Sequence, residues 1–308
     1  MNRTLNLKRT LAAMATSLAL LGGSAGIVSA AGIGTTVSPP VYDLAANPGE
    51  TIIQKMTVHN DASSEQSYVP VVNTIAPANE QGGLSFGPAS SADLSGWITV
   101  TPSKLDLPAD QSADFTITIK VPTNATAGGH YATVFAKSDT PGTLDGANIT
   151  ALVGTSFLLK VSGATVESAD VVEFSTSRAR LIPGEPIDFA VRVRNSGNVH
   201  VRPQGTIQIF RDSIKVDEVT VNADGLTVLP SSIRKFTAES NKSLPSGTYT
   251  AKLTLTYGAG QTLSVPGISF VVIGEASMMT LVAIILGIFV LILIAALLVN
   301  RRKPSKGK

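Results

Sequence analysis

The chain has 308 residues, of which 44% are hydrophobic and 15% charged, with a formal net charge of +2 and no cysteine. This length allows about two domains, and the hydrophobic content excludes disorder throughout the chain. Few charges beside 27 glycines and 17 prolines favour strands and turns over long helices. The lack of cysteine excludes disulfides, thiol nucleophiles and cysteine-based zinc sites.

Residues 1–30 have the pattern of a signal peptide. Arg3, Lys8 and Arg9 precede an apolar stretch from Leu11 to Val28. Val28-Ser29-Ala30 then offers small side chains at the positions that a signal peptidase reads. We expect cleavage after Ala30 and an exported mature chain.

Two stretches of thirteen residues resemble each other: PGETIIQKMTVHN, Pro48 to Asn60, and PGEPIDFAVRVRN, Pro183 to Asn195. In the second copy, apolar and polar residues alternate strictly, which predicts a strand with one face in the core. In the first copy Gln54 breaks the alternation. Pro-Gly before each strand predicts a turn, and the Asn at the end predicts another. The repetition indicates a duplicated β domain.

Further short strands are predicted at 97–101, 113–121 and 130–137 in the first half, and at 248–257 in the second. Many short strands separated by turn signals are typical of a β-sandwich. We therefore predict an all-β fold with two tandem immunoglobulin-like β-sandwich domains, residues 31–162 and 163–275, joined near Val161 to Val166. Tyr131 and Tyr249 occupy matching places, where a tyrosine can hydrogen-bond back to a turn.

Residues 276–299 contain no charge and are long enough to cross a hydrocarbon core of about 30 Å as a helix. Five cations in residues 300–308 predict a short cytoplasmic tail. The sequence thus predicts a single-pass protein of the plasma membrane with its N-terminal part outside. Between the two ends, residues 31–275 carry 16 cations and 22 anions, so nucleic acid is excluded as a partner.

We expect no enzyme activity, no cofactor and no metal. The three histidines, His59, His130 and His200, lack metal-ligand spacing. No GxSxG motif joins a strand to a helix, and the aspartates around 106–114 lack the order of a calcium loop. His59 and His200 lie at or near strand ends, where we expect solvated side chains.

Five residues are candidates for ligand binding: Phe86, Trp97, Arg192, Arg194 and Arg202. The guanidinium groups suit carboxylate or phosphate recognition, with a solvated face paired to nearby acids as the alternative. Phe86 lies in a long polar connection from Pro77 to Gly96, where it could stack on a sugar or close the end of the sandwich. Trp97 could form a carbohydrate platform, but its alternating neighbours favour the core.

The segments VSPPVYDLAANPGETIIQKMTVHN and LSGWITVTPSKLDLPADQSADFTITIKVPTNATAGGHYATV, followed by a second sandwich, a span and a basic tail, resemble the WxL-interacting proteins of Gram-positive cell surfaces. The resemblance covers Thr36 to about Lys137 and is carried by Trp97, Lys120-Val121-Pro122 and Gly128-Gly129. It implies a peptidoglycan-binding first domain and a partner-binding second domain.

Two functions remain open. The first is a membrane-anchored binding or adhesion protein that tethers the envelope to cell-wall peptidoglycan or to a cell-surface protein. The second is a structural spacer or a pilus-chaperone-like assembly factor for secreted proteins, which would use an uncharged edge strand. The acidic and basic residues after Val166 predict a protected edge there.

Overall fold

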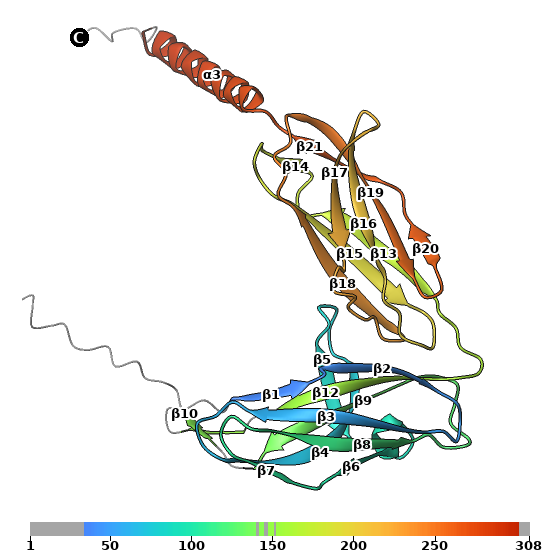
Figure 1. Cartoon of the computed structure of the whole chain (residues 1–308). Helices are drawn as coiled ribbons and strands as arrows, with labels where there is room; N and C mark the ends of the chain where they lie inside the picture. The colour runs from blue at the N-terminus through green and yellow to red at the C-terminus, as the bar shows by residue number, and fades with distance from the viewer. Residues whose placement is uncertain (1–33, 140–141, 145–146, 151, 302–308) are drawn as a thin grey trace, which may run out of the picture.

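The computed structural model describes residues 34–139, 142–144, 147–150 and 152–301. The predicted signal peptide and most of the basic tail lie outside these residues. The described chain is all-β apart from a short helix and a long C-terminal one, and it forms two sandwich-like domains that follow each other along the chain (Figure 1).

The first sandwich packs two antiparallel-rich sheets against each other. Sheet 1 has the spatial order β1 (Thr35–Ser38), β3 (Thr51–Asn60), β8 (Ser112–Lys120) and β6 (Ile98–Thr101). Sheet 2 has the order β2 (Val41–Ala46), β12 (Leu152–Val161), β9 (Gly128–Ser138), β4 (Gln66–Pro77) and β5 (Leu84–Pro88), and β7 (Leu105–Leu107) also pairs with β4. The helix α2 (Leu94–Trp97) precedes β6, and β10 (Gly142–Leu144) pairs with β11 (Ala147–Ile149) as a separate hairpin.

The second sandwich repeats the plan with a smaller first sheet. Sheet 3 has the order β13 (Ala169–Thr176), β15 (Ile187–Asn195) and β18 (Ser232–Ser240). Sheet 4 has the order β14 (Arg180–Leu181), β21 (Ile268–Val272), β19 (Gly247–Tyr257), β16 (Gln204–Arg211) and β17 (Ile214–Val221), with β20 (Gln261–Ser264) beside β19. Since β12 ends at Val161 and β13 begins at Ala169, the join falls between these residues.

The repeated phrase forms β3 in the first sandwich and β15 in the second, and its glutamate and asparagine make the same local hydrogen bonds in both. Gly49 and Gly184 have φ angles of +85° and +88°, which a glycine adopts without strain. After each glycine, a glutamate carboxylate accepts a hydrogen bond from the backbone N–H three residues earlier: Glu50 from Asn47 at 2.8 Å, and Glu185 from Ile182 at 3.1 Å. The same hydrogen bond therefore stabilises the Pro-Gly-Glu turn in both copies.

The asparagine that ends each copy is fully buried and closes the following loop. Asn60 donates to the carbonyl of Ser64, and Asn195 donates to that of Val199, both at 2.8 Å. Each side-chain oxygen accepts the backbone N–H two residues later. Buried polar groups are stable only when they are hydrogen-bonded, so these asparagines are structural.

Each sandwich has its own core, and the inward-facing apolar residues of the repeated phrase form part of it. Ile187, Phe189, Val191 and Val193 of β15 are at most 2% exposed and pack in the second core. In β3, Met56 and Val58 are completely buried, whereas Gln54 is half-buried and Ile53 is 64% exposed. The single misfit in the pattern thus sits where β3 is least covered.

Only one of the two matching tyrosines forms a corner. The Tyr249 hydroxyl donates to the backbone carbonyl of Pro245 at 2.6 Å, four residues back, as predicted. The Tyr131 side chain points instead from the outer side of sheet 2, and its hydroxyl reaches the second sandwich. The two copies therefore share the strand but not this contact.

The chain continues from β21 into helix α3 (Glu275–Arg301), which projects away from the second sandwich (Figure 1). Its large apolar side chains between Met279 and Ile294 are exposed. Within the part of the chain that the structure describes, no helix qualifies by length and apolar character as a membrane-crossing segment.

Candidate functional site

The outer side of sheet 2 carries large apolar side chains among polar ones. In the register of the sheet, Val71 lies opposite Phe135, Phe135 opposite Gly154, and Ile75 opposite Phe86. The large aliphatic and phenylalanine side chains that we group on this outer side are Val41, Val71, Ile75, Leu84, Phe86, Phe135, Leu152 and Leu158, and we call this set the apolar face. Polar residues share the same side, namely Asp43, Asn73, Thr133, Lys137, Ser156 and Lys160. The opposite side of the sheet, with Val134 and Phe157, faces the core.

Sheet 1 of the same domain has the outer side expected of a sandwich in water. It presents Thr57, Lys55 and Asp114, together with threonines of β6 and β8, and Ile53 is its large apolar exception. An antiparallel sheet normally pairs an apolar inner side with a polar outer side. The number of large apolar side chains on the outer side of sheet 2 thus departs from this rule and needs a cause.

Part of the apolar face is accessible. Val41, Leu84, Phe86 and Leu152 are 37–51% exposed. The Phe86 ring meets the Phe135 ring edge-on, with centroids 4.9 Å apart. Gly154 makes room for Phe135, because a Cβ atom at Gly154 would lie 2.6 Å from Phe135 Cδ1.

The second sandwich covers the other part. Leu229 from the loop before β18 packs with Ile75, Tyr131 and Leu158 in a small buried cluster between the domains. The apolar face therefore divides into a portion sealed by the second sandwich and a portion that remains open beyond it.

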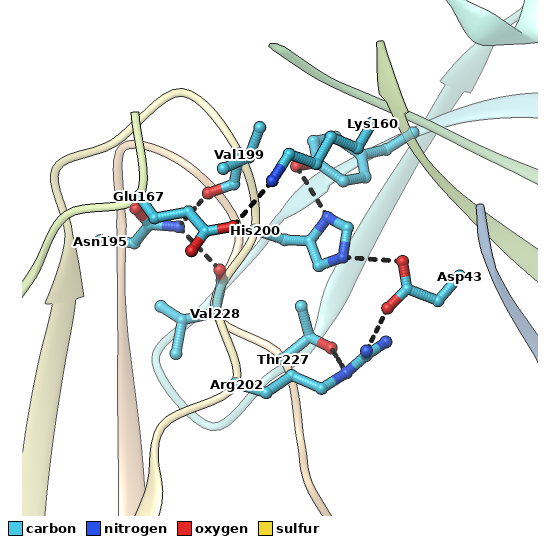
Figure 2. Close-up of polar contacts among 10 residues, drawn as sticks. Asp43, Lys160, Glu167, Asn195, Val199, His200, Arg202, Thr227 and Val228 are labelled. Carbon is cyan, nitrogen blue, oxygen red and sulfur yellow. Dashed lines mark hydrogen bonds and ion pairs between the residues drawn. The ribbon is translucent and has the colours of Figure 1, made fainter. Parts of the chain in front are cut away.

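Polar contacts surround this seal (Figure 2). The Asp43 carboxylate on β2 accepts hydrogen bonds from His200 Nε2, at 3.1 Å, and from the Arg202 guanidinium. Arg202 Nε also donates to the Thr227 hydroxyl at 3.1 Å. Lys160 forms an ion pair with Glu167 at 2.8 Å, at the start of the linker.

The His200 ring lies between the two sandwiches. Its side chain is only 8% exposed, and burial, the largest cause, lowers its pKa although Asp43 acts in the opposite direction. The Tyr131 hydroxyl lies within hydrogen-bonding distance of Nδ1 of His200, at 3.4 Å, and burial raises the pKa of Tyr131. The expectation of a solvated His200 was wrong, because the second sandwich folds back onto sheet 2.

The tip of the β4–β5 hairpin makes a second polar contact. The Glu80 carboxylate accepts from Nε and Nη2 of Arg192 at 2.7 and 2.6 Å, and the Glu80 carbonyl accepts from the Lys235 N–H at 2.7 Å. The hydrogen bond to Arg192 lowers the pKa of Glu80. Arg192 is also bound to Glu173 at 3.0 Å. The hairpin thus holds the two sandwiches together.

The loop after β15 completes the junction. The Asn198 carbonyl accepts from the Gly129 N–H at 2.8 Å, and its side chain bonds to the backbone of Val166 and Ala164 in the linker. Backbone and side chain of one residue therefore contact both β9 and the linker, which limits how far the sandwiches can move apart.

An interdomain cleft of about 530 Å³ opens beside this junction. Val41 and Leu84 line it from the first sandwich, and Leu226 and Arg234 from the second. The Arg234 guanidinium donates to the Thr227 carbonyl at 2.8 Å and packs against Gly82, and burial lowers its pKa. The cleft continues the open portion of the apolar face.

The predicted site residues are not brought together. Arg192 and Arg202 both contact the first sandwich, whereas Arg194 forms a two-bond pair with Asp170 inside the second. Each of these guanidinium groups has a carboxylate partner. The alternative from sequence, a solvated face paired with Glu173, Glu185 and Asp188, accounts only for the contact of Arg192 with Glu173.

Trp97 and Phe86 have different surroundings. Trp97 is 8% exposed in the first core, and its ring contacts that of His130 with centroids 4.6 Å apart, so it is no carbohydrate platform. Phe86 is half exposed on the apolar face. The long connection that carries it is not a loop throughout, because it contains β5 and α2.

Sequence reasoning missed Asp43, Leu84 and the apolar face as a whole. One signal was available: LSFGP places two large apolar residues at alternate positions in an otherwise polar connection. Within the described residues, no group of three or more His, Asp or Glu side chains is arranged to hold a metal ion.

No protein-family model matches the sequence, and no curated protein matches it. Solved structures with a similar chain path include the class 5 fimbriae chaperone CfaA, with 13% identity and a TM-score of 0.41 over 78% of this chain and 99% of that one. The Escherichia coli chaperone DraB gives 15% identity and a TM-score of 0.36 over 78% and 98%. The CsuC–CsuE chaperone–tip adhesion subunit complex of Acinetobacter baumannii has 9% identity and a TM-score of 0.37, over 79% of this chain and 99% of that one. Likenesses of this size decide nothing about function.

Proposed function

We propose that this chain is a non-catalytic protein-binding factor of the cell envelope, which holds a segment of a secreted or surface protein against the apolar face of its first sandwich. This role belongs to the class of assembly factors that the sequence left open as its second hypothesis. The observation that carries the proposal is the open portion of the apolar face, on a sheet whose neighbour in the same domain has a polar outer side.

Covering the exposed apolar side chains with a protein ligand is energetically more favourable than leaving them in water. Fully burying a Leu or Phe side chain contributes roughly 1.5–3 kcal/mol. Since Val41, Leu84, Phe86 and Leu152 are about half exposed, covering all four contributes roughly 3–6 kcal/mol. Exposed apolar groups of this kind mark interaction sites in soluble domains.

We further propose that the sandwiches lie outside the cell and that α3 anchors them to the membrane. The exposed apolar side chains of α3 and the basic residues after it support this location. The test is flotation of the full chain with liposomes, followed by a wash in alkaline carbonate. An anchored chain stays in the lipid fraction after the wash, whereas release into the aqueous fraction would overturn this part of the proposal.

The binding role is tested with cell-wall fragments from the native host, before and after protease treatment. The full chain in non-ionic detergent should sediment with untreated fragments and remain in solution with protease-stripped ones. Phe86→Ser should weaken sedimentation, and Ile53→Ser, an equal loss of exposed apolar surface on sheet 1, should not. Failure to sediment with untreated fragments would overturn the proposal.

A second candidate is binding to the wall glycan, which the resemblance to WxL-interacting proteins implies. The half-exposed ring of Phe86 favours it, because aromatic rings can stack on sugars. Equal sedimentation with untreated and stripped fragments would support glycan binding and refute the protein-binding role.

A further inference from the structure

We propose that β5 is a docking edge, to which a partner protein adds an extended strand that continues sheet 2. This inference rests on the proposed function and specifies how the partner binds. It goes beyond the apolar face, because it assigns a role to the backbone of one strand as well as to side chains.

The first argument is the position of β5 in the sheet. β5 is the last strand in the order of sheet 2 and pairs, among the described strands, with β4 alone. An edge strand presents a row of unpaired N–H and C=O groups to a potential partner. By contrast, β12 is already paired on both sides from Ser156 to Val161, so it offers no free edge there.

The second argument is that β5, although short and ended by Pro88, lacks charges and bulges. Proteins normally guard their edges with charges, bulges or short strands. The edge strand β13 carries Asp170 and Glu173 and has a register shift between Val171 and Glu173. The edge strand β17 carries Lys215, Asp217 and Glu218, and its pairing with β16 is also shifted. β5, with the sequence LSFGP, has no charge and no register shift.

The third argument is exposure. Four of the five residues of β5 are exposed, and Leu84 and Phe86 are 37% and 50% accessible. No other described strand has two large apolar side chains exposed to this degree. Three other uncharged edge strands, β1, β6 and β20, expose serine, threonine or glutamine, while their large aliphatic side chains are less exposed.

These features define the partner. Side chains directly opposite each other on neighbouring strands lie about 4.5–5.5 Å apart, so apolar residues at alternate positions of the added strand would cover Leu84 and Phe86. Pro88 ends the free edge, so only about four or five residues need to pair. Residues 31–162 carry 5 cations and 11 anions, which favours a partner segment with basic flanks.

The probe is the peptide Lys-Lys-Val-Thr-Val-Thr-Val-Thr-Lys-Lys, tested on the full chain in non-ionic detergent by fluorescence anisotropy and amide hydrogen exchange. We expect saturable binding and slower exchange of the amides in Leu84–Pro88. The matched control peptide has N-methylated valines. It keeps the side chains but cannot donate these hydrogen bonds, so it should bind at least about tenfold more weakly.

Variants of the chain distinguish binding at β5 from a general effect of added charge or lost apolar surface. Phe86→Lys should weaken binding by about tenfold or more, and Phe86→Ser should weaken it without adding a charge. Ile53→Lys adds the same charge to the outer side of sheet 1 and should leave binding unchanged. Thermal unfolding of each variant checks that the first sandwich remains folded.

Several results would overturn the inference: no binding of the peptide, equal binding of the N-methylated peptide, or protection confined to amides outside β5. The outcome also separates the two proposals. If the chain sediments with untreated wall fragments but does not bind the peptide, the protein-binding role stands and the docking edge is rejected. Failure of both would reject the protein-binding role itself.

Discussion

Replacing Asn195 by alanine should destabilise the second sandwich strongly. Its side chain is completely buried, and its Nδ2 donates to the carbonyls of Val199 and Val228 at 2.8 and 2.9 Å. Its Oδ1 accepts the Gly197 N–H at 2.9 Å. Asn195→Ala removes all of these bonds at once and leaves the Val199 carbonyl without a partner, whereas the Val228 carbonyl keeps the Val201 N–H and the Gly197 N–H keeps the Ser168 carbonyl.

The magnitude follows from the cost of unpaired polar groups. Each buried group that loses its only partner costs about 1–3 kcal/mol. At the lower end, because water can enter the loop, the Val199 carbonyl costs about 1 kcal/mol and the two other lost bonds about 0.5 kcal/mol each, which makes about 2 kcal/mol together. For a domain of roughly 100 residues this corresponds to a fall in melting temperature of roughly 10 °C. The change is large beside a total stability of about 5–15 kcal/mol.

The chain offers a built-in assay, because its single tryptophan, Trp97, lies in the core of the first sandwich. In urea unfolding of the full chain, tryptophan fluorescence follows the first sandwich, whereas far-UV circular dichroism follows both. Asn195→Ala should shift the circular dichroism transition more than the fluorescence transition. Asn60→Ala, the equivalent change in the first sandwich, should shift the fluorescence transition.

Asn241→Ala is the control, because Asn241 is exposed and should change stability by less than about 0.5 kcal/mol. A loss below about 1 kcal/mol for Asn195→Ala would refute the reasoning, since it would mean that the three bonds are replaced at little cost.

Three further predictions concern the corner, the histidines and the junction. Tyr249→Phe removes the hydrogen bond to the Pro245 carbonyl and should cost about 1 kcal/mol in urea unfolding; no change would contradict a structural corner. In an NMR titration, His130 should have a pKa above 6.5, because its hydrogen bond to Asp93 favours the charged ring, and His200 a pKa below 6.5, because it is buried. The stabilisation from His130 is therefore complete below about pH 6.5 and lost as the pH rises through its raised pKa. Stability linked to His200 is instead complete above about pH 6.5 and lost as the pH falls through its lowered pKa, because burial disfavours the charged ring. Glu80→Gln should widen the distribution of interdomain distances in small-angle X-ray scattering, whereas Glu185→Gln, which acts within the second sandwich, should not.

The fold could be predicted from sequence wherever local periodicity decides it. Strict alternation in β15 and the Pro-Gly turns before β3 and β15 specify strands and their faces without distant information. The alternating residues after Trp97 likewise indicated its place in the core. These signals involve residues close together in the chain, so they can be recognised without knowing the tertiary structure.

The junction could not be predicted, because its contacts join residues far apart in the chain. Arg202 binds Asp43, and Arg192 binds Glu80. Neither ion pair produces a periodic pattern in the sequence. The same arginines were therefore taken as candidates for an external ligand. β5 was missed for a different reason: with a glycine and a proline in five residues, it resembles a loop by composition.

The position of β12 between β2 and β9 has a mechanical consequence. β12 is the strand that leaves the first sandwich, and it ends at Val161 where the linker begins. A pull between the first sandwich and α3 would act along the axis of β12. Because its hydrogen bonds lie across this axis in both ladders, they share the load in shear rather than breaking one after another. The first sandwich should therefore resist extension through its linker far better than unzipping from the exposed strand at its other edge.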